Sequence, residues 1–95
     1  MGFWVYMLRC SDGSYYMGQT DNLELRVAQH IAGAIPGCYT CSRLPLERVF
    51  VQKFSSRVEA LASERRIKGW SRGKKEALIR GDWVELSRLA RSGPH

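Results

Sequence analysis

Alternating apolar and polar positions near the start of the chain predict a β-hairpin. Residues 3–10 and 15–20 are rich in aromatic and branched side chains, as strands usually are. Asp12-Gly13 lies between the two segments and favours a tight turn, because glycine readily takes a positive φ and aspartate tolerates one. A second alternating region at residues 47–54 predicts a third strand.

Successive side chains of a strand point to opposite faces of its sheet, so the alternation also predicts which residues share a face. One face of the hairpin is expected to carry Trp4, Tyr6, Leu8, Tyr16 and Gly18. The other face is expected to carry Val5, Met7, Tyr15 and Met17. On the third strand, one face should hold Val49, Val51 and Lys53, and the other Phe50, Gln52 and Phe54.

Helical spacing and helix-end signals predict four helices, at residues 22–32, 56–67 and 71–79 and from residue 82 onward. Capping boxes, in which an acid or hydroxyl residue is followed three positions later by glutamate, begin at Asp21, Ser56 and Asp82. Ser71 is the expected cap of the third helix. The predicted core residues are Leu23, Val27 and Ile31 in the first helix, and Val58, Leu61 and Ala62 in the second.

The predicted order of elements is β-β-α-β-α-α-α. This order indicates an α/β (α+β) protein with a three-stranded, mostly antiparallel sheet flanked by helices, since the strands need cover on their apolar faces. A length of 95 residues suits one domain, which we expect at residues 1–91, with a flexible tail at residues 92–95. The irregular segment at residues 33–46 is long for a compact domain, and such loops are often functional.

The charge balance favours anionic partners. Lysine and arginine number 15 against 9 acidic residues, which gives a net charge of +6. The excess concentrates between residues 65 and 80, and a basic cluster of this kind attracts phosphate backbones or anionic lipid. The alternative is a solvated helical face that keeps the protein soluble. No segment has the length of a membrane span or the pattern of a signal peptide, so we expect a cytoplasmic protein without a membrane partner.

Three cysteines, Cys10, Cys38 and Cys41, are expected to be free thiols in a reducing cytoplasm. Cys38 and Cys41 have the C-x-x-C spacing of many zinc sites. A zinc site usually needs a second pair of ligands at similar spacing, and the chain has none. His30 and Cys10 are the alternative third and fourth ligands, which makes a metal-thiolate site the less favoured interpretation.

Five scattered side chains have the chemistry of phosphodiester hydrolysis. Tyr6 and Tyr16 are expected to lie on nearby rungs of the hairpin, although a buried tyrosine pair is more often plain core. Arg26 and His30 are four positions apart on the first helix and so project from the same side, where the arginine can clamp a phosphate and the histidine can exchange a proton. Glu64 flanks the predicted core residues of its helix, and an inward carboxylate needs a partner or a metal.

Plain structural roles remain open for these residues. For Arg26 and His30 the alternative is a solvated helix face, although a charged and a titratable residue beside predicted core positions would be an odd structural choice. Glu64 has Lys68 four positions later and can form an exposed ion pair with it, worth about 0.2–0.5 kcal/mol.

Together these motifs resemble the GIY-YIG nuclease superfamily, and in particular its small stand-alone bacterial members. Trp4-Val5-Tyr6 matches the first signature triplet, and Tyr16-Met17-Gly18 matches the second. The most specific match is the stretch 15–23 followed by Arg26 and His30. The second is Glu59-Ala60-Leu61 followed by Glu64, Ile67 and Lys68. The resemblance covers nearly the whole chain, from about residue 2 to residue 83.

The resemblance implies a role for each matched residue. Tyr6 activates water or transfers a proton, Tyr16 assists at the phosphate, Arg26 neutralises phosphate charge, and His30 aids proton transfer. Glu64 holds one Mg²⁺ or Mn²⁺, and Mg²⁺ suits a single protein carboxylate completed by waters and phosphate oxygens. Gly18 leaves room for the backbone of the cleaved strand. The expected nucleic-acid contacts are Gly18, Tyr39, Lys68, Arg72, Lys74 and Lys75.

We therefore expect a metal-dependent endonuclease that cuts DNA. Two alternatives remain: a nucleic-acid-binding module that does not cut, and a catalytic subunit that needs a protein partner for specificity. The chain departs from the family pattern at Trp4, Val5 and Met17, which are structural positions. A further departure is Glu76, because larger members often place an asparagine there, and a carboxylate could alter how phosphate or metal is positioned.

Overall fold

The hydrophobic pattern folds into seven elements in the expected order β-β-α-β-α-α-α. The computed structural model describes residues 2–33 and 43–92, with the backbone alone for residues 90–92. The strands are β1 (Phe3–Arg9), β2 (Tyr15–Thr20) and β3 (Glu47–Phe54). The helices are α1 (Leu23–Ile31), α2 (Arg57–Lys68), α3 (Arg72–Arg80) and α4 (Trp83–Ser92). The predicted α+β class with one three-stranded sheet is confirmed.

The sheet is antiparallel throughout, with strand order β2-β1-β3, so that β1 is central. The β1–β2 hairpin closes on the predicted turn, where Gly13 has a φ of 84° and the Asp12 carboxylate accepts the backbone N–H of Ser14 at 3.0 Å. Across the hairpin, Tyr6 stands opposite Gly18. The turn thus fixes the register that sets these two residues side by side.

A β-bulge interrupts the pairing of β1 with β3. Met7 is opposite Phe50, whereas the next residue, Leu8, is opposite Arg48, so Val49 is the extra residue of the bulge. Val49 and Phe50 both pack against the same apolar cluster. The prediction that they face opposite sides of the sheet is wrong, because the bulge breaks the alternation at this point.

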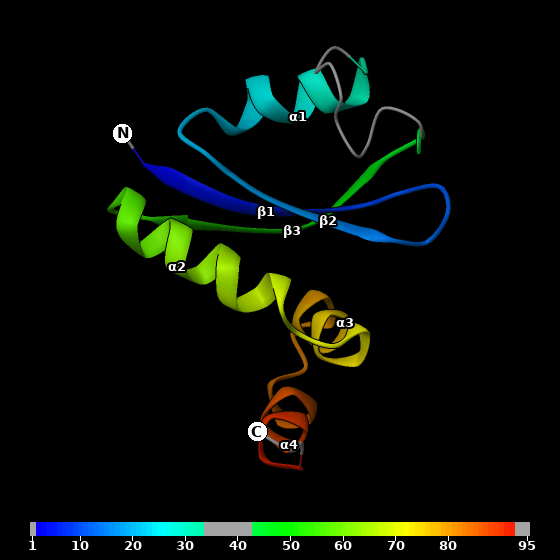
Figure 1. Cartoon of the computed structure of the whole chain (residues 1–95), viewed down its shortest axis with the longest axis vertical. Helices are drawn as coiled ribbons and strands as arrows, with labels where there is room; N and C mark the ends of the chain where they lie inside the picture. The colour runs from blue at the N-terminus through cyan, green and yellow to red at the C-terminus, as the bar shows by residue number, and fades with distance from the viewer. Residues whose placement is uncertain (1, 34–42, 93–95) are drawn as a thin grey trace.

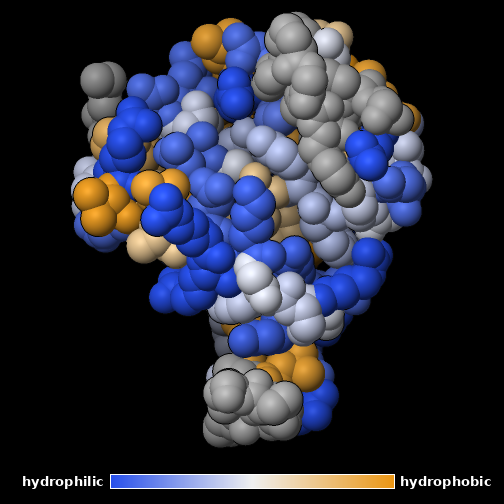
Figure 2. All heavy atoms as spheres, in the orientation of Figure 1, coloured by the Kyte–Doolittle hydropathy of each residue, from blue (hydrophilic) through white to orange (hydrophobic). Residues whose placement is uncertain are grey.

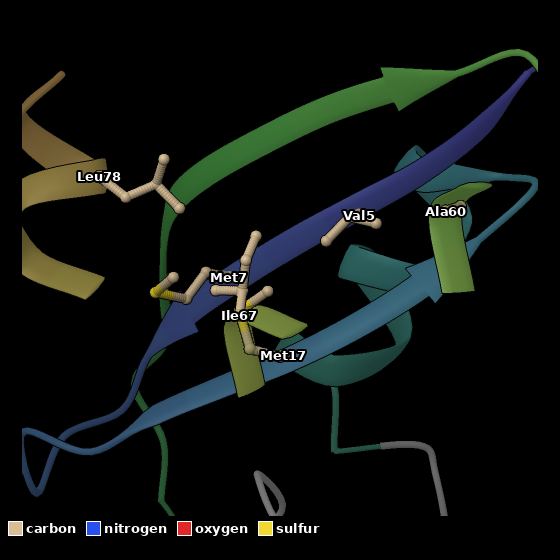
Figure 3. Packing of buried hydrophobic residues seen from close by; sticks show 6 residues of the cluster. All are labelled: Val5, Met7, Met17, Ala60, Ile67 and Leu78. Atoms are coloured by element: carbon tan, nitrogen blue, oxygen red, sulfur yellow. The ribbon is translucent and has the colours of Figure 1, made fainter. Parts of the chain in front are cut away.

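Helices cover both faces of the sheet. Figure 1 shows α1 on one face and α2 with α3 on the other. The hydrophobic core lies on the α2–α3 side and consists of Val5, Met7, Met17, Ala60, Ile67 and Leu78. Figure 3 shows side chains of β1, β2 and α2 meeting there, among them Met7, Met17 and Ile67. This division leaves the other face of the hairpin free to carry polar side chains under α1.

The helix starts agree closely with the capping signals. The side chains of Ser56, Ser71 and Asp82 accept the backbone N–H of the residue three positions later, at 3.2, 3.3 and 3.1 Å, as predicted. The start of α1 differs by one position. Asn22, rather than Asp21, is its N-cap, and its side chain accepts the N–H of Leu25 at 3.2 Å.

The predicted core faces of α1 and α2 are partly wrong. In α2, Val58 is 77% exposed and Ala62 is exposed, while the buried residues are Ala60, Ser63 and Ile67. Small side chains at two of these positions let the helix approach the sheet closely. In α1, Ile31 is 55% exposed and the buried residue is His30. The side of α1 that faces the sheet therefore carries a buried polar residue, and an analysis of hydrophobic periodicity does not detect such a side.

The last helix projects from the rest of the molecule (Figure 1) and packs mainly on α3. Its first residues, Trp83 and Val84, are strongly exposed. Hydrophilic residues cover most of the face seen in Figure 2, with hydrophobic patches near one end of α2 and at α4. Within the described ranges, none of the helices has the length and apolar character to cross a membrane.

Candidate functional site

Three ring side chains meet beneath α1. The hydroxyl of Tyr6, on β1, lies 2.9 Å from Nε2 of His30, on α1. The ring centroid of Tyr16, on β2, lies 4.9 Å from that of His30 and 6.4 Å from that of Tyr6. Tyr6 is 1% exposed and His30 is 0% exposed, whereas Tyr16 is only partly buried. The fold therefore gathers three of the predicted site residues into one polar cluster inside an otherwise apolar sandwich.

Gly18 makes this cluster possible. A Cβ placed on Gly18 would lie 2.4 Å from the hydroxyl oxygen of Tyr6, which is far inside contact distance. The phenol of Tyr6 thus occupies the space that a side chain at position 18 would need. The expectation that Gly18 makes room for a nucleic-acid strand stays a prediction, and the structure adds a second reason for a glycine here.

His30 is held in its neutral form. Burial, and to a lesser extent the positive charge of nearby Arg26, lower the pKa of the His30 imidazole below its ordinary value. A neutral imidazole has one acceptor nitrogen. In the tautomer that carries its proton on Nδ1, Nε2 accepts the hydroxyl proton of Tyr6. The pair can then move a proton from the phenol to the ring.

Arg26 lies one turn before His30 on α1 and is partly buried. Its positive charge contributes to the lowered pKa of His30, after burial. The four-residue spacing places both residues on one side of α1. The role of Arg26 at a phosphate stays a prediction. The alternative of a wholly solvated helix face does not hold for His30, which is fully buried.

Glu64 comes from the other layer, on α2. Its side chain is 14% exposed, and its Oε1 lies 3.9 Å from Nζ of Lys68, the predicted partner four positions later. Within residues 2–33 and 43–92, no three His, Cys, Asp or Glu side chains lie close enough together to hold a metal ion. A cation at Glu64 would thus have one protein carboxylate, with waters and phosphate oxygens as its other ligands, and this donor set fits Mg²⁺.

A cavity of about 290 Å³ lies where β2 meets the ends of α2 and α3. It is lined by Tyr15, Tyr16, Met17, Lys68 and Lys75. Tyr16 belongs to the ring cluster, and Lys68 is the partner of Glu64. The cavity runs along β2, an edge strand of the sheet, and none of the other predicted catalytic or metal-binding residues, Tyr6, Arg26, His30 and Glu64, is among its lining residues.

The predicted basic residues of α3 differ in their surroundings. Lys75 lines the cavity, whereas Nζ of Lys74 lies 4.8 Å from the ring centroid of Trp70. Arg72 stacks on the ring of Tyr15 at 4.9 Å and donates to the carbonyl oxygen of Gly13 at 2.8 Å. Arg72 thus supports the hairpin in addition to any role at a phosphate.

Tyr39, Cys38 and Cys41 lie outside the described residues, so their predicted roles stay predictions. Cys10, the remaining cysteine, is a buried free thiol.

Comparisons with known proteins show the family of the chain. Residues 2–77 match the model of the GIY-YIG catalytic domain. The chain belongs to the GIY-YIG family. Members of this family are generally nucleases, and the small relatives that the chain resembles are bacterial and archaeal.

The relatives have nearly the same length as this GIY-YIG protein. A UPF0213 protein of Natronomonas pharaonis is 45% identical over 76 residues, which cover 80% of this chain and 88% of the relative. A UPF0213 protein of Lacticaseibacillus paracasei is 39% identical over 83 residues, 87% of this chain and 92% of the relative. The solution NMR structure of a UPF0213 protein from Bacillus halodurans is 36% identical, with a TM-score of 0.56 over 94% of this chain and 97% of that one.

Glu76, the departure from the family pattern, has structural partners in this GIY-YIG domain. The hydroxyl of Tyr15 donates to its Oε2 at 3.2 Å, and Nε of Arg72 lies 3.2 Å from the same oxygen. Together with the Arg72–Gly13 hydrogen bond, these contacts tie α3 to the β1–β2 hairpin. We call Tyr15, Arg72 and Glu76 the hairpin latch. Its carboxylate is engaged in holding the wall of the cavity.

Tyr15 is the residue that sequence reasoning left out of the site. It lines the cavity described above and a second one of about 300 Å³, which also contains Arg9, Glu76 and Arg80. Strand alternation assigned Tyr15 to the core face, opposite Tyr16. At the end of an edge strand, however, a side chain of that face still reaches the surface, and the only available signal was its position beside a signature triplet.

Proposed function

We propose that this protein is a metal-dependent endonuclease that hydrolyses phosphodiester bonds in DNA. The observation that carries the proposal is the buried hydrogen bond between the Tyr6 hydroxyl and His30 Nε2 at 2.9 Å, with Tyr16 against the same imidazole. A phenol and a neutral imidazole form a proton relay, which a plain hydrophobic core does not need. Membership of a family that consists generally of nucleases supports this interpretation.

In the proposed reaction Tyr6 and His30 act together on the attacking water. The Tyr6 oxygen takes a proton from water while the phenol gives its own proton to Nε2 of His30, which becomes an imidazolium. The water oxygen forms a bond to phosphorus, the opposite P–O bond breaks, and the leaving oxygen takes a proton from solvent. The imidazolium then returns its proton to the solvent, which restores the neutral ring. The lowered pKa of His30 keeps the imidazole neutral and able to accept at neutral pH.

In this proposal Arg26 and Glu64 stabilise the negative charge of the transition state. The guanidinium of Arg26 offsets the extra negative charge that develops on the phosphate oxygens in the transition state. Glu64 holds the divalent cation, which when bound supplies Lewis-acid stabilisation to the same oxygens. Tyr16, the most exposed member of the ring cluster, orients the phosphate at the mouth of the cavity.

Binding depends on the basic residues around the cavity. Lys68 and Lys75 line it, and Lys74 and Arg72 lie on the adjoining helix α3. Neutralising phosphates with such side chains releases counter-ions, so affinity for DNA should fall steeply as salt concentration rises.

The nearly complete burial of Tyr6 and His30 favours one alternative, a nucleic-acid-binding module that does not cut. Because Tyr6 and His30 are buried, an attacking water cannot reach the Tyr6 hydroxyl unless the site opens. The same cavity and basic residues would serve such a module. The two functions differ in whether any divalent cation produces cleavage.

The test uses purified protein with Mg²⁺ or Mn²⁺ on single-stranded, duplex and branched DNA, with RNA of the same sequence alongside. We expect cleavage by the wild type and a loss of at least a hundredfold in Arg26→Ala and Glu64→Ala, as for the removal of other groups that stabilise transition-state charge. Glu24→Ala, which removes an exposed carboxylate from α1, is the control and should cut normally. Binding without cleavage by every protein would establish the non-cutting module.

A further inference from the structure

Glu64 forms one ion pair among the residues that the structure describes. Only 14% of its side chain is exposed, and Lys68 Nζ lies 3.9 Å from its Oε1. The Lys68 side chain is 63% exposed. A mobile, strongly hydrated ammonium therefore sits against a fixed and largely buried carboxylate.

The ammonium group of Lys68 also has a second possible partner, a phosphate bound in the cavity. It lines the cavity that contains Tyr16, the tyrosine of the ring cluster that is most open to solvent. The flexible four-carbon stem of a lysine lets its ammonium move between neighbouring acceptors. A phosphate in the cavity would offer it a charge-assisted hydrogen bond, which is stronger than a partly exposed ion pair at 3.9 Å.

We propose that Lys68 is a removable counter-ion of Glu64. In the free protein its ammonium neutralises the carboxylate and competes with a divalent cation. When nucleic acid enters the cavity, Lys68 turns to a phosphate and leaves Glu64 to the cation. The inference rests on the proposed function and deepens it: nucleic acid and divalent cation bind with positive coupling, so that the cation is recruited chiefly to the loaded site.

Lys75 provides a matched comparison for this idea. It carries the same charge and lines the same cavity, yet the ion pair of Glu64 is with Lys68. Removing either lysine removes one positive charge near a bound cation and one contact to the phosphate backbone. Only the loss of Lys68 also frees the carboxylate of Glu64.

The experiment measures Mn²⁺ binding to the full chain by the electron paramagnetic resonance signal of free Mn²⁺. It is done without nucleic acid and with a phosphorothioate oligonucleotide, which resists hydrolysis. We expect the oligonucleotide to raise the Mn²⁺ affinity of the wild type. Lys68→Met should bind Mn²⁺ about threefold more tightly than Lys75→Met when no oligonucleotide is present, the size expected for one partly exposed ion pair. Lys68→Met should also lose most of the coupling, whereas Lys75→Met should keep it.

The outcomes separate this inference from the proposed function. Equal Mn²⁺ affinities in Lys68→Met and Lys75→Met, or an oligonucleotide that leaves wild-type affinity unchanged, would overturn the counter-ion role while Glu64 remained a metal ligand. Mn²⁺ binding by Glu64→Gln at the wild-type level would overturn both, because the cation would then bind elsewhere. Circular dichroism of each variant checks that it is folded.

Discussion

The two faces of the central strand β1 are built for different purposes. On one face, Val5 and Met7 pack against α2 and α3 in a core of apolar side chains. On the other, Tyr6 is buried just as completely, but it is hydrogen-bonded to a buried histidine. Neighbouring residues of a single strand therefore serve a hydrophobic core and a polar cluster, separated only by the pleat of the sheet.

The difference shows how a chain of 95 residues can afford a buried polar site. Small domains have little apolar surface to bury, so a polar cluster in the interior reduces an already limited core. Here the cluster is confined to the side of α1, and its buried tyrosine and histidine satisfy each other. Stability should come mainly from the α2–α3 face and chemistry mainly from the α1 face.

The largest effect should come from the hydroxyl of Tyr6. Tyr6→Phe removes the proton donor to His30 and keeps the ring, so we expect cleavage to fall about 10²–10⁴-fold, as for the loss of other general acid–base groups. Tyr15→Phe removes a hydroxyl from the opposite face, where it contacts Glu76, and should cut at nearly the wild-type rate. Initial rates on a labelled oligonucleotide compare the two, and similar losses in both would contradict the division of labour.

The apolar face should respond in the opposite way. Met7→Ala leaves a cavity in the core and should lower the free energy of unfolding by about 2–5 kcal/mol. Urea denaturation measures the change. Val51→Ala, at an exposed position of β3, is the control and should cost well under half as much. A Met7→Ala protein that is as stable as the wild type would show that the core does not carry the stability of this fold.

A smaller effect is expected at the hairpin latch, which lies on the apolar side of the sheet. Glu76→Gln keeps an acceptor for Tyr15 but removes the ion pair with Arg72, so unfolding should become easier by about 0.5–1 kcal/mol. Thermal denaturation measures the loss. Cleavage should change little, because the carboxylate holds the hairpin. A large loss of cleavage at unchanged stability would instead assign the Glu76 carboxylate a direct role at the phosphate.

The smallest effect should be the pH dependence that His30 adds to stability. Its pKa is lower in the folded protein than the ordinary value of 6.5, so the unfolded chain binds the proton first as pH falls. Stability from the buried neutral ring is complete above pH 6.5 and declines as pH falls toward the lowered pKa. Denaturation curves across this range should show the decline in wild type and a weaker one in His30→Gln. Parallel curves would indicate that the ring is not buried in its neutral form.

The local signals of the sequence predicted most of the fold. The Asp12-Gly13 turn, the three hydroxyl or acidic caps at Ser56, Ser71 and Asp82, and the order of elements are all confirmed. These features depend on a few neighbouring residues and on backbone geometry, which sequence reveals directly.

Features set by tertiary packing were harder to predict. The buried face of α2 uses Ala60 and Ser63, because a close helix-to-sheet approach favours small residues over the larger Val58 that periodicity selected. Val49 joins the core through a bulge that no local motif marked. In the candidate site, spacing paired Arg26 with His30, but the meeting of His30 with Tyr6 depends on how α1 crosses the sheet.

Tyr6 and Gly18 face each other across the hairpin, and the phenol fills the volume beside the glycine. The last residues of the two signature triplets, Tyr6 and Gly18, are thus in direct contact. Position 18 cannot gain even a methyl group unless position 6 gives up its ring or the ring moves aside. A side chain at position 18 therefore has to be matched by a change at position 6, twelve residues earlier in the chain, whereas position 6 can lose atoms while Gly18 stays.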